Sequence, residues 1–132
     1  MSDYLDDPRL AEAEAEVFEA EAAERRGDLV AAAARYHRAA DRYAEVTFEV
    51  PVSLPRTRSV WAVSAVAASS RGRDFERAIA LAERFLAEPD GLTPAGRQEL
   101  RELLTVARSL RPATTAPRTK LLRWRDEIRC AA

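Results

Sequence analysis

Histidine and cysteine are common catalytic nucleophiles and bases, and this chain of 132 residues has one of each, His37 and Cys130. A cysteine thiolate beside an imidazole could act as a nucleophile with its general base. His37, however, lies between Tyr36 and Arg38 in a segment with helical periodicity, where we expect a surface or groove-edge position. One histidine and one cysteine also supply too few ligands for a zinc site. The sequence therefore predicts no enzyme activity and no bound metal.

Glutamates are concentrated near the N-terminus, at spacings that place several of them on one side of a helix. Helical metal sites combine such carboxylates with a histidine three positions later, and this companion is missing here. We expect a solvated acidic face, with a groove for a basic partner as the alternative. The residues are Glu12, Glu14, Glu16, Glu19 and Glu21. The four glycines are scattered, so no phosphate-binding loop is predicted and no cofactor is expected.

The net charge of -1 conceals an asymmetry between the two parts of the chain. Residues 1–50 carry a net charge of −7 and residues 51–132 one of +6. Solvated helix faces of two signs would explain this distribution. The alternative is that the charged faces meet partners, or meet each other head to tail in an oligomer.

Features of the termini and of the apolar runs indicate a soluble protein of the cytoplasm. Residues 1–7 are acidic and lack the apolar core of a signal peptide. The longest run of low charge, residues 59–70, is too short to cross a bilayer. A single cysteine excludes an intramolecular disulfide and suits a reducing compartment.

The first half of the chain predicts a pair of antiparallel helices. Asp7 followed by Pro8 is a typical helix start, and the first helix is expected from Pro8 to Arg26. Gly27 ends it, and Asp28 caps a second helix that is expected to reach about Val46. Because the connection is so short, the two helices must form a hairpin.

The segment 47–55 is expected to lack helix, because it contains β-branched residues and two prolines. Its apolar residues alternate and could pack as an extended strap over the hairpins: Phe48, Val50, Val52 and Leu54. A third helix over about 55–70 is nearly uncharged and is expected to be the central, most buried element.

Asp74 is expected to cap a fourth helix over residues 75–88. Thr93 and Pro94 open a fifth helix to about Leu110, whose charged outer face suits the terminal capping helix of a repeat stack. Residues 1–110 thus form one helical domain, and the fold class is all-α.

Residues 111–132 form a second region, a linker followed by a basic amphipathic segment. Leu121, Trp124 and Ile128 share one face of a possible helix over 119–132. Arginines interleaved with Trp124 could bind RNA or DNA, but Asp126 and Glu127 interrupt them, so nucleic acid is an unfavoured partner. Docking on a protein partner, or back on its own domain, is favoured.

Two stretches share a recurring pattern. The first has Ala20, Gly27-Asp28-Leu29, Ala32, Tyr36 and Ala39; the second has Trp61, Ala65, Gly72, Asp74-Phe75, Ala78, Ala82 and Phe85-Leu86. This pattern resembles the tetratricopeptide repeat (TPR), in which small residues let paired helices approach and aromatic residues fill the gaps between hairpins.

The resemblance covers about residues 9–110 and implies TPR-like hairpins stacked in a short array. Proteins of this family bind peptide segments in the concave groove lined by the first helix of each hairpin. Carried over, the partner-binding residues would be Glu14, Val17, Glu21, Glu24, Ser59, Ala62, Val66 and Ser69, with Trp124 in the C-terminal segment.

Two functions fit these expectations. The favoured one is a protein–protein interaction module, an adaptor or regulatory subunit that holds a segment of another protein. The alternative is a structural protein that self-assembles by head-to-tail helical contacts. Arginine is abundant while Lys120 is the single lysine, and alanine is frequent, which suggests a high-GC bacterium. The chain also resembles short bacterial repeat proteins in general, which often accompany signalling or defence enzymes encoded nearby. This resemblance implies that the protein acts beside such an enzyme.

Overall fold

The computed structural model describes residues 6–112; the predicted linker beyond 112 and the C-terminal segment with Trp124 lie outside the described residues. Five helices follow one another along the described chain: α1 (Pro8–Arg25), α2 (Leu29–Glu49), α3 (Pro55–Arg71), α4 (Phe75–Ala87) and α5 (Pro94–Leu110). This stretch contains no strand. The predicted all-α class is therefore confirmed.

The helix starts follow from side chains that accept backbone N–H groups left free in the first turn. The Asp28 carboxylate accepts from the N–H of Ala31 at 3.1 Å, and Thr93 Oγ1 accepts from the N–H of Gly96 at 2.9 Å. Asp7 and Asp74 cap α1 and α4 in the same manner. Proline stands at the start of α1, α3 and α5, where the missing N–H costs nothing.

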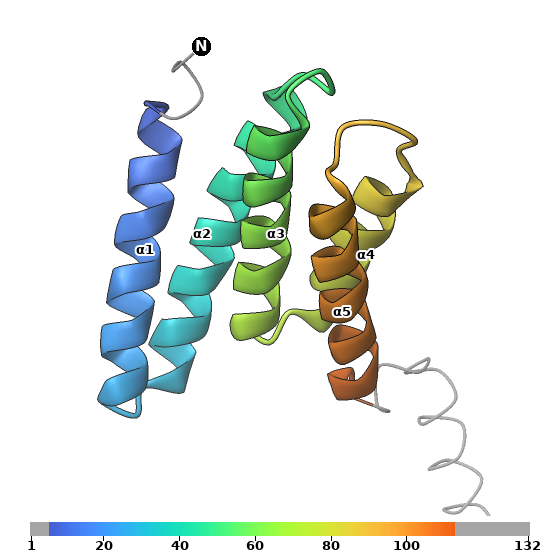
Figure 1. The fold of residues 1–132 in the computed structure, drawn as a ribbon. Helices are drawn as coiled ribbons and strands as arrows, with labels where there is room; N and C mark the ends of the chain where they lie inside the picture. The colour runs from blue at the N-terminus through green and yellow to red at the C-terminus, as the bar shows by residue number, and fades with distance from the viewer. Residues whose placement is uncertain (1–5, 113–132) are drawn as a thin grey trace, which may run out of the picture.

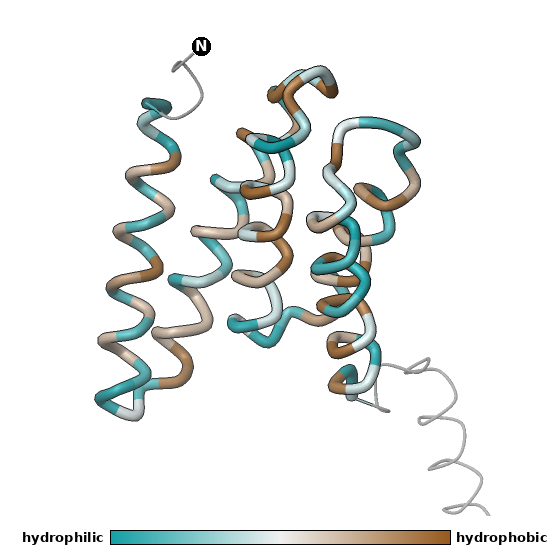
Figure 2. Tube along the Cα trace, in the orientation of Figure 1, coloured by the Kyte–Doolittle hydropathy of each residue, from teal (hydrophilic) through white to brown (hydrophobic). Residues whose placement is uncertain are grey.

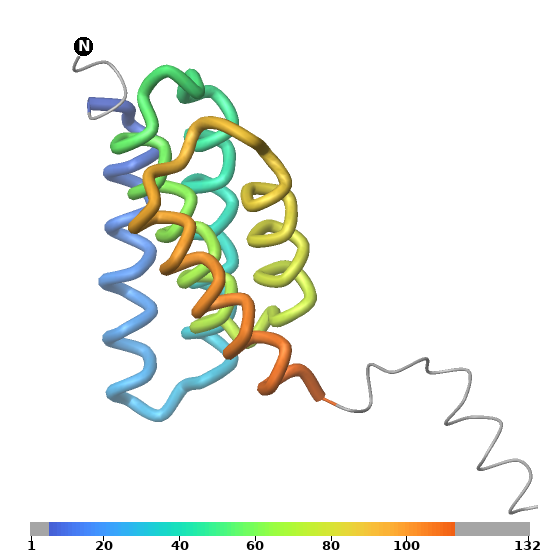
Figure 3. Tube along the Cα trace, turned by 45° about the vertical axis from the view of Figure 1, so that its right-hand side comes forward, coloured from blue at the N-terminus to red at the C-terminus, as the bar shows by residue number. Residues whose placement is uncertain are grey.

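The helices form two layers. Figures 1 and 3 show α1, α3 and α5 side by side in one layer, with α2 and α4 in the layer behind them. Each short turn reverses the chain, so α2 packs between α1 and α3, and α4 packs between α3 and α5. Along every helix the hydrophobic positions recur between hydrophilic ones (Figure 2), as expected for helices buried on one side.

Helix α3 is shared by two separate parts of the core. Ala62 and Val66 pack with α4 and α5, in a cluster that includes Phe85 and Leu100. Ala65 and Ala68, on another side of the same helix, pack with residues of α1 and α2. The predicted central, buried position of this helix is confirmed.

The expectation that segment 47–55 lacks helix and forms an extended strap is wrong in its first part, because α2 continues to Glu49. Thr47 is fully buried and its hydroxyl donates to the carbonyl oxygen of Tyr43 at 2.7 Å. The Phe48 ring lies 5.2 Å from the Phe85 ring, measured between centroids. The burial of Thr47 with its hydrogen bond within α2, and the tertiary contact of Phe48 with Phe85, outweigh the weak helix propensity of both residues. Only residues 50–54 separate α2 from α3.

The turns of the two hairpins have the same length. Gly27 ends α1 with φ of 77°, and Arg73 occupies the equivalent left-handed position after α3 with φ of 61°. Each is followed by the aspartate that caps the next helix. Gly72 therefore corresponds to Arg26, one position before the left-handed residue.

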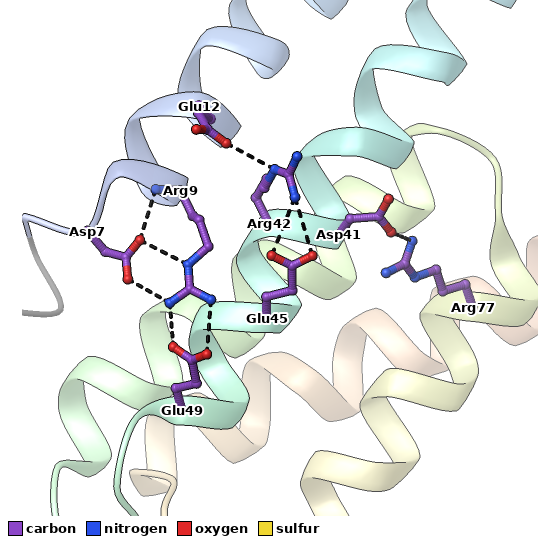
Figure 4. A network of polar contacts seen from close by, with 8 residues as sticks. All are labelled: Asp7, Arg9, Glu12, Asp41, Arg42, Glu45, Glu49 and Arg77. Atoms are coloured by element: carbon purple, nitrogen blue, oxygen red, sulfur yellow. Dashed lines mark hydrogen bonds and ion pairs between the residues drawn. The ribbon is translucent and has the colours of Figure 1, made fainter.

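Ion pairs join neighbouring helices on the surface (Figure 4). Arg9 at the start of α1 contacts Asp7 and Glu49, the last residue of α2. Arg42 of α2 lies 3.1 Å from Glu12 of α1. Arg77 of α4 pairs with Asp41, which connects α4 to α2 within the second layer.

Candidate protein-binding groove

A groove runs between α3 and α5 on the face of the first layer. It consists of two open hollows of about 560 Å³ each, which share Val63 and Glu99 and so adjoin each other. The first hollow lies at the N-terminal parts of both helices, and the second extends along their later turns. We call the two together the α3–α5 groove.

The floor of the α3–α5 groove is apolar. Val60, Val63 and Ala67 line it from α3, and Leu103 and Val106 line it from α5. Val60 remains 54% exposed and Val106 49% exposed, although valine is usually buried. Adjacent apolar side chains left open in a hollow are typical of a surface that binds another chain.

The rim of the groove is acidic along α5. Glu99 and Glu102 line it one helical turn apart, and Glu102 accepts a hydrogen bond from the Gln98 side chain at 3.2 Å. Within residues 6–112, neither carboxylate has an ion-pair partner. Arg56 lies at the opposite end, beside the start of α5. The middle of the groove therefore favours a basic group.

The separation of the two walls is set where α5 begins. Ser59 Oγ accepts a hydrogen bond from the N–H of Thr93 at 2.9 Å. A Cβ on Gly96 would come within 2.5 Å of the same Ser59 Oγ, so only glycine permits this approach of α5 to α3. Beneath the groove, α3 and α5 are thus in direct contact at the start of α5, while the surface between them remains open.

The four residues predicted to line a groove from α3 do not do so as a set. Ser59, Ala62, Val66 and Ser69 are all buried, and Ala62 and Val66 belong to the core shared with α4 and α5. The open face instead carries Val60, Val63 and Ala67. Of the four predicted residues, Ser59 also lines the first hollow. The more exposed lining residues each follow a predicted one by a single position, which corresponds to a rotation of about 100° around the helix.

The predicted residues of α1 lie apart from this groove. Glu14 is exposed, while Val17 is half-buried against the core. Glu21 and Glu24 each lie 3.4 Å from the guanidinium of Arg71, at the C-terminal end of α3. These two carboxylates join α1 to α3. Trp124 lies outside the described residues.

Arg71 and Glu24 also enclose a buried phenol. The Tyr36 hydroxyl donates a hydrogen bond to Glu24, and the Arg71 guanidinium lies over the Tyr36 ring, 4.6 Å from its centroid. Burial of the phenol, together with the hydrogen bond to Glu24, raises the pKa of Tyr36 to about 12. Tyr36 therefore stays protonated at neutral pH and serves to hold the end of the first hairpin together.

His37 is half-buried, and its Nε2 lies 3.0 Å from the carbonyl oxygen of Gly72. Because a carbonyl only accepts, Nε2 carries the proton and donates. In the part of the chain that the structure describes, no three histidine, cysteine or acidic side chains are grouped so as to hold a metal ion. None of the five described helices is both long and apolar enough to cross a membrane.

Comparison with protein-family models, with curated proteins and with solved structures finds no match for this chain. The candidate site therefore stands on its own geometry: an apolar floor between two parallel helices, and on one wall two carboxylates that form no ion pair with any residue of the described range 6–112.

Proposed function

We propose that this chain is a protein–protein interaction module, an adaptor or regulatory subunit, that binds a segment of another protein in the α3–α5 groove. The observation that carries the proposal is the pair of exposed valines, Val60 of α3 in the first hollow of the groove and Val106 of α5 in the adjoining second hollow. The resemblance to TPR hairpins supports it, because that family binds peptides along the first helix of each hairpin, and α3 would be the first helix of the second hairpin.

The groove favours an amphipathic helix as the bound segment. Val60, Val63 and Ala67 stand at positions i, i+3 and i+7 of α3, so they form one straight ridge along it. A helix in a groove presents apolar residues at the same spacing. Glu99 and Glu102 would then attract lysine or arginine beside the apolar stripe of the partner. In a bacterial host, a signalling or defence enzyme would be a fitting carrier of this segment.

Selection from a library of displayed 16-residue peptides tests the proposal. Selected peptides should combine an apolar stripe with basic residues and should bind the full chain in an anisotropy titration. Val106→Arg should weaken this binding at least tenfold, because it places a charge in the groove floor. Val30→Arg is the matched control, since Val30 is 83% exposed on α2, away from the groove residues.

Charge reversal provides an independent readout of the same site. The double variant Glu99→Lys and Glu102→Lys should lose the basic peptides, whereas acidic ones should gain affinity. If the peptides bind the Val106→Arg and Val30→Arg variants equally well, the groove is not the binding site and the proposal fails.

The alternative of head-to-tail self-assembly requires two end faces that fit each other. Phe18 is 65% exposed on α1 at one end of the array, whereas Arg101, Thr105 and Arg108 are exposed on α5 at the other. Sedimentation across protein and salt concentrations tests this alternative directly.

A further inference from the structure

The α3–α5 groove lies next to the point at which the described chain ends. Val106 lines the groove one helical turn before Leu110, the last residue of α5. The sequence continues for 20 residues after Pro112. Any segment that follows α5 is thus tethered within a short distance of the open groove, at a high effective concentration.

The sequence of that segment matches the requirements of the groove. Leu121, Trp124 and Ile128 have the spacing i, i+3 and i+7, which is the spacing of Val60, Val63 and Ala67 in α3. On a helix, Arg125 and Arg129 fall on one edge of this apolar stripe. Residues 113–132 contain five basic and two acidic side chains, opposite in sign to the rim formed by Glu99 and Glu102.

The chain is long enough to turn back. Residues 111–118 can span up to about 27 Å when extended. A helix over residues 119–132 would be about 21 Å long, and the groove wall from Glu99 to Val106 covers about 11 Å of α5. Running antiparallel to α5, the helix would bring Arg125 near Glu102 and Arg129 near Glu99. The two pairs of charges have similar separations, about 6 Å for the arginines and about 4.5 Å for the glutamates.

A second hollow at the same end of the molecule is a poorer fit. It has a volume of about 310 Å³ and is lined by residues of α1 to α5 that include Leu29, Ala33 and Leu110. Arg71 and Arg73 also line it. Glu24 lines this hollow too and pairs with Arg71, so the lining keeps one net positive charge. Arg56, Glu99 and Glu102 instead give the α3–α5 groove one net negative charge, so the groove is the more favourable docking site for an arginine-rich segment.

From these observations we propose that residues 119–132 bind the α3–α5 groove of their own chain as an amphipathic helix antiparallel to α5. If the groove is also the partner-binding site, as the proposed function holds, this segment competes with the partner for the groove. A partner must then displace this segment. The apparent affinity for the partner is therefore reduced in proportion to the fraction of molecules whose groove is free.

Cys130 allows a direct test on the full chain, because it is the sole cysteine. A nitroxide attached there broadens the amide signals of nearby residues in the ¹⁵N-labelled protein. For the antiparallel helix, broadening should be strongest around Arg56, Val60 and Gly96, and weak around Leu29 and Ala33. The double variant Arg125→Glu and Arg129→Glu should abolish this pattern. A mixture of nitroxide-labelled chains without ¹⁵N and ¹⁵N chains without nitroxide shows whether the contact also forms between chains.

Each outcome decides the proposal. Broadening confined to the groove within one chain, and lost in the double variant, supports it. Broadening around Leu29 and Ala33, broadening between chains only, or no broadening of groove residues overturns it.

A peptide titration separates this proposal from the proposed function. If the segment occupies the groove, the double variant Arg125→Glu and Arg129→Glu should bind the selected peptides about tenfold more tightly than the original chain. If peptides bind the groove while the spin label reports no contact there, the competitor is ruled out and the function stands. If the label reports contact but no peptide binds even the double variant, the function fails and the intramolecular contact stands.

Discussion

The imidazole of His37 lies directly on the backbone of Gly72. Its Nε2 donates to the Gly72 carbonyl oxygen at 3.0 Å, and a Cβ added to Gly72 would come within 2.7 Å of His37 Cδ2. Gly72 has φ of −78°, an ordinary helical value, so its conformation does not require glycine. The close approach of α2 to the turn after α3 does require it.

Replacing Gly72 by alanine should therefore destabilise the protein, even though alanine suits the backbone better. We expect a loss of about 1–2 kcal/mol in the free energy of unfolding, because the imidazole must move and its hydrogen bond is lost. Urea unfolding measures the loss. In a His37→Ala background the same substitution should cost much less; an equal cost in both backgrounds would contradict the assignment.

Arg73 offers the opposite case, a residue that is strained where glycine would not be. Its φ of 61° disfavours any residue with a Cβ. Arg73→Gly should raise the free energy of unfolding by about 1 kcal/mol. Gly27→Arg is the matched reverse change, because Gly27 has φ of 77° and no atom lies within 4 Å of its missing Cβ. It should destabilise by a similar amount, and thermal unfolding of the two variants should show shifts of opposite sign.

Arg58 joins the loop after α2 to the loop after α4. Its Nε donates to the Val50 carbonyl oxygen at 3.1 Å, and its guanidinium pairs with Glu88 while only 5% of the side chain is exposed. Arg58→Met should lower stability by about 3 kcal/mol, because it leaves the Glu88 carboxylate without its cation.

Arg56→Met is the control for this effect, since Arg56 is exposed and lies only two residues away. We expect it to change the midpoint of urea unfolding very little. Similar midpoints for the Arg58→Met and Arg56→Met variants would show that the buried pair contributes nothing.

The Tyr36–Glu24 contact predicts a loss of stability at alkaline pH. The pKa of Tyr36 is raised from 10.0 to about 12 by burial and by the hydrogen bond to Glu24. Folding therefore favours the protonated phenol, a contribution that is complete below about pH 10 and disappears as the pH rises through about 12. Tyr36→Phe should remove this dependence. When the free energy of unfolding is measured from pH 8 upward, the values for the original protein and the Tyr36→Phe variant should converge. A difference between the two proteins that stays constant with pH would refute the assignment.

Helix positions were predictable because their boundaries carry local chemistry. Asp7, Asp28, Asp74 and Thr93 mark the starts of α1, α2, α4 and α5 in the sequence, and each caps its helix in the structure. The end of α2 was not predictable in this way. Thr47 is fully buried and Phe48 packs against Phe85, which is distant in the sequence; neither effect is contained in local helix propensity.

The face of α3 that lines the groove was the least predictable feature. Valine, alanine and serine occur on every side of this helix, so the hydrophobic pattern does not distinguish Val60 and Val63 from Ala62 and Val66. Only the placement of α4 and α5 decides which of these residues are covered. In α1, the glutamates differ in their environments for a similar reason, because Arg71 comes from another helix.

The division of α3 between two core clusters has a consequence for how this protein loses its structure. In a simple stack, a terminal hairpin can melt while the rest persists. Here Ala65 and Ala68 support the first hairpin, while Ala62 and Val66 support α4 and α5 from the same helix. Unfolding of α1 and α2, or of α4 and α5, would expose one side of α3 and so destabilise the helices that pack against its other side. The five described helices should thus unfold as one cooperative unit, although their core is divided into separate clusters.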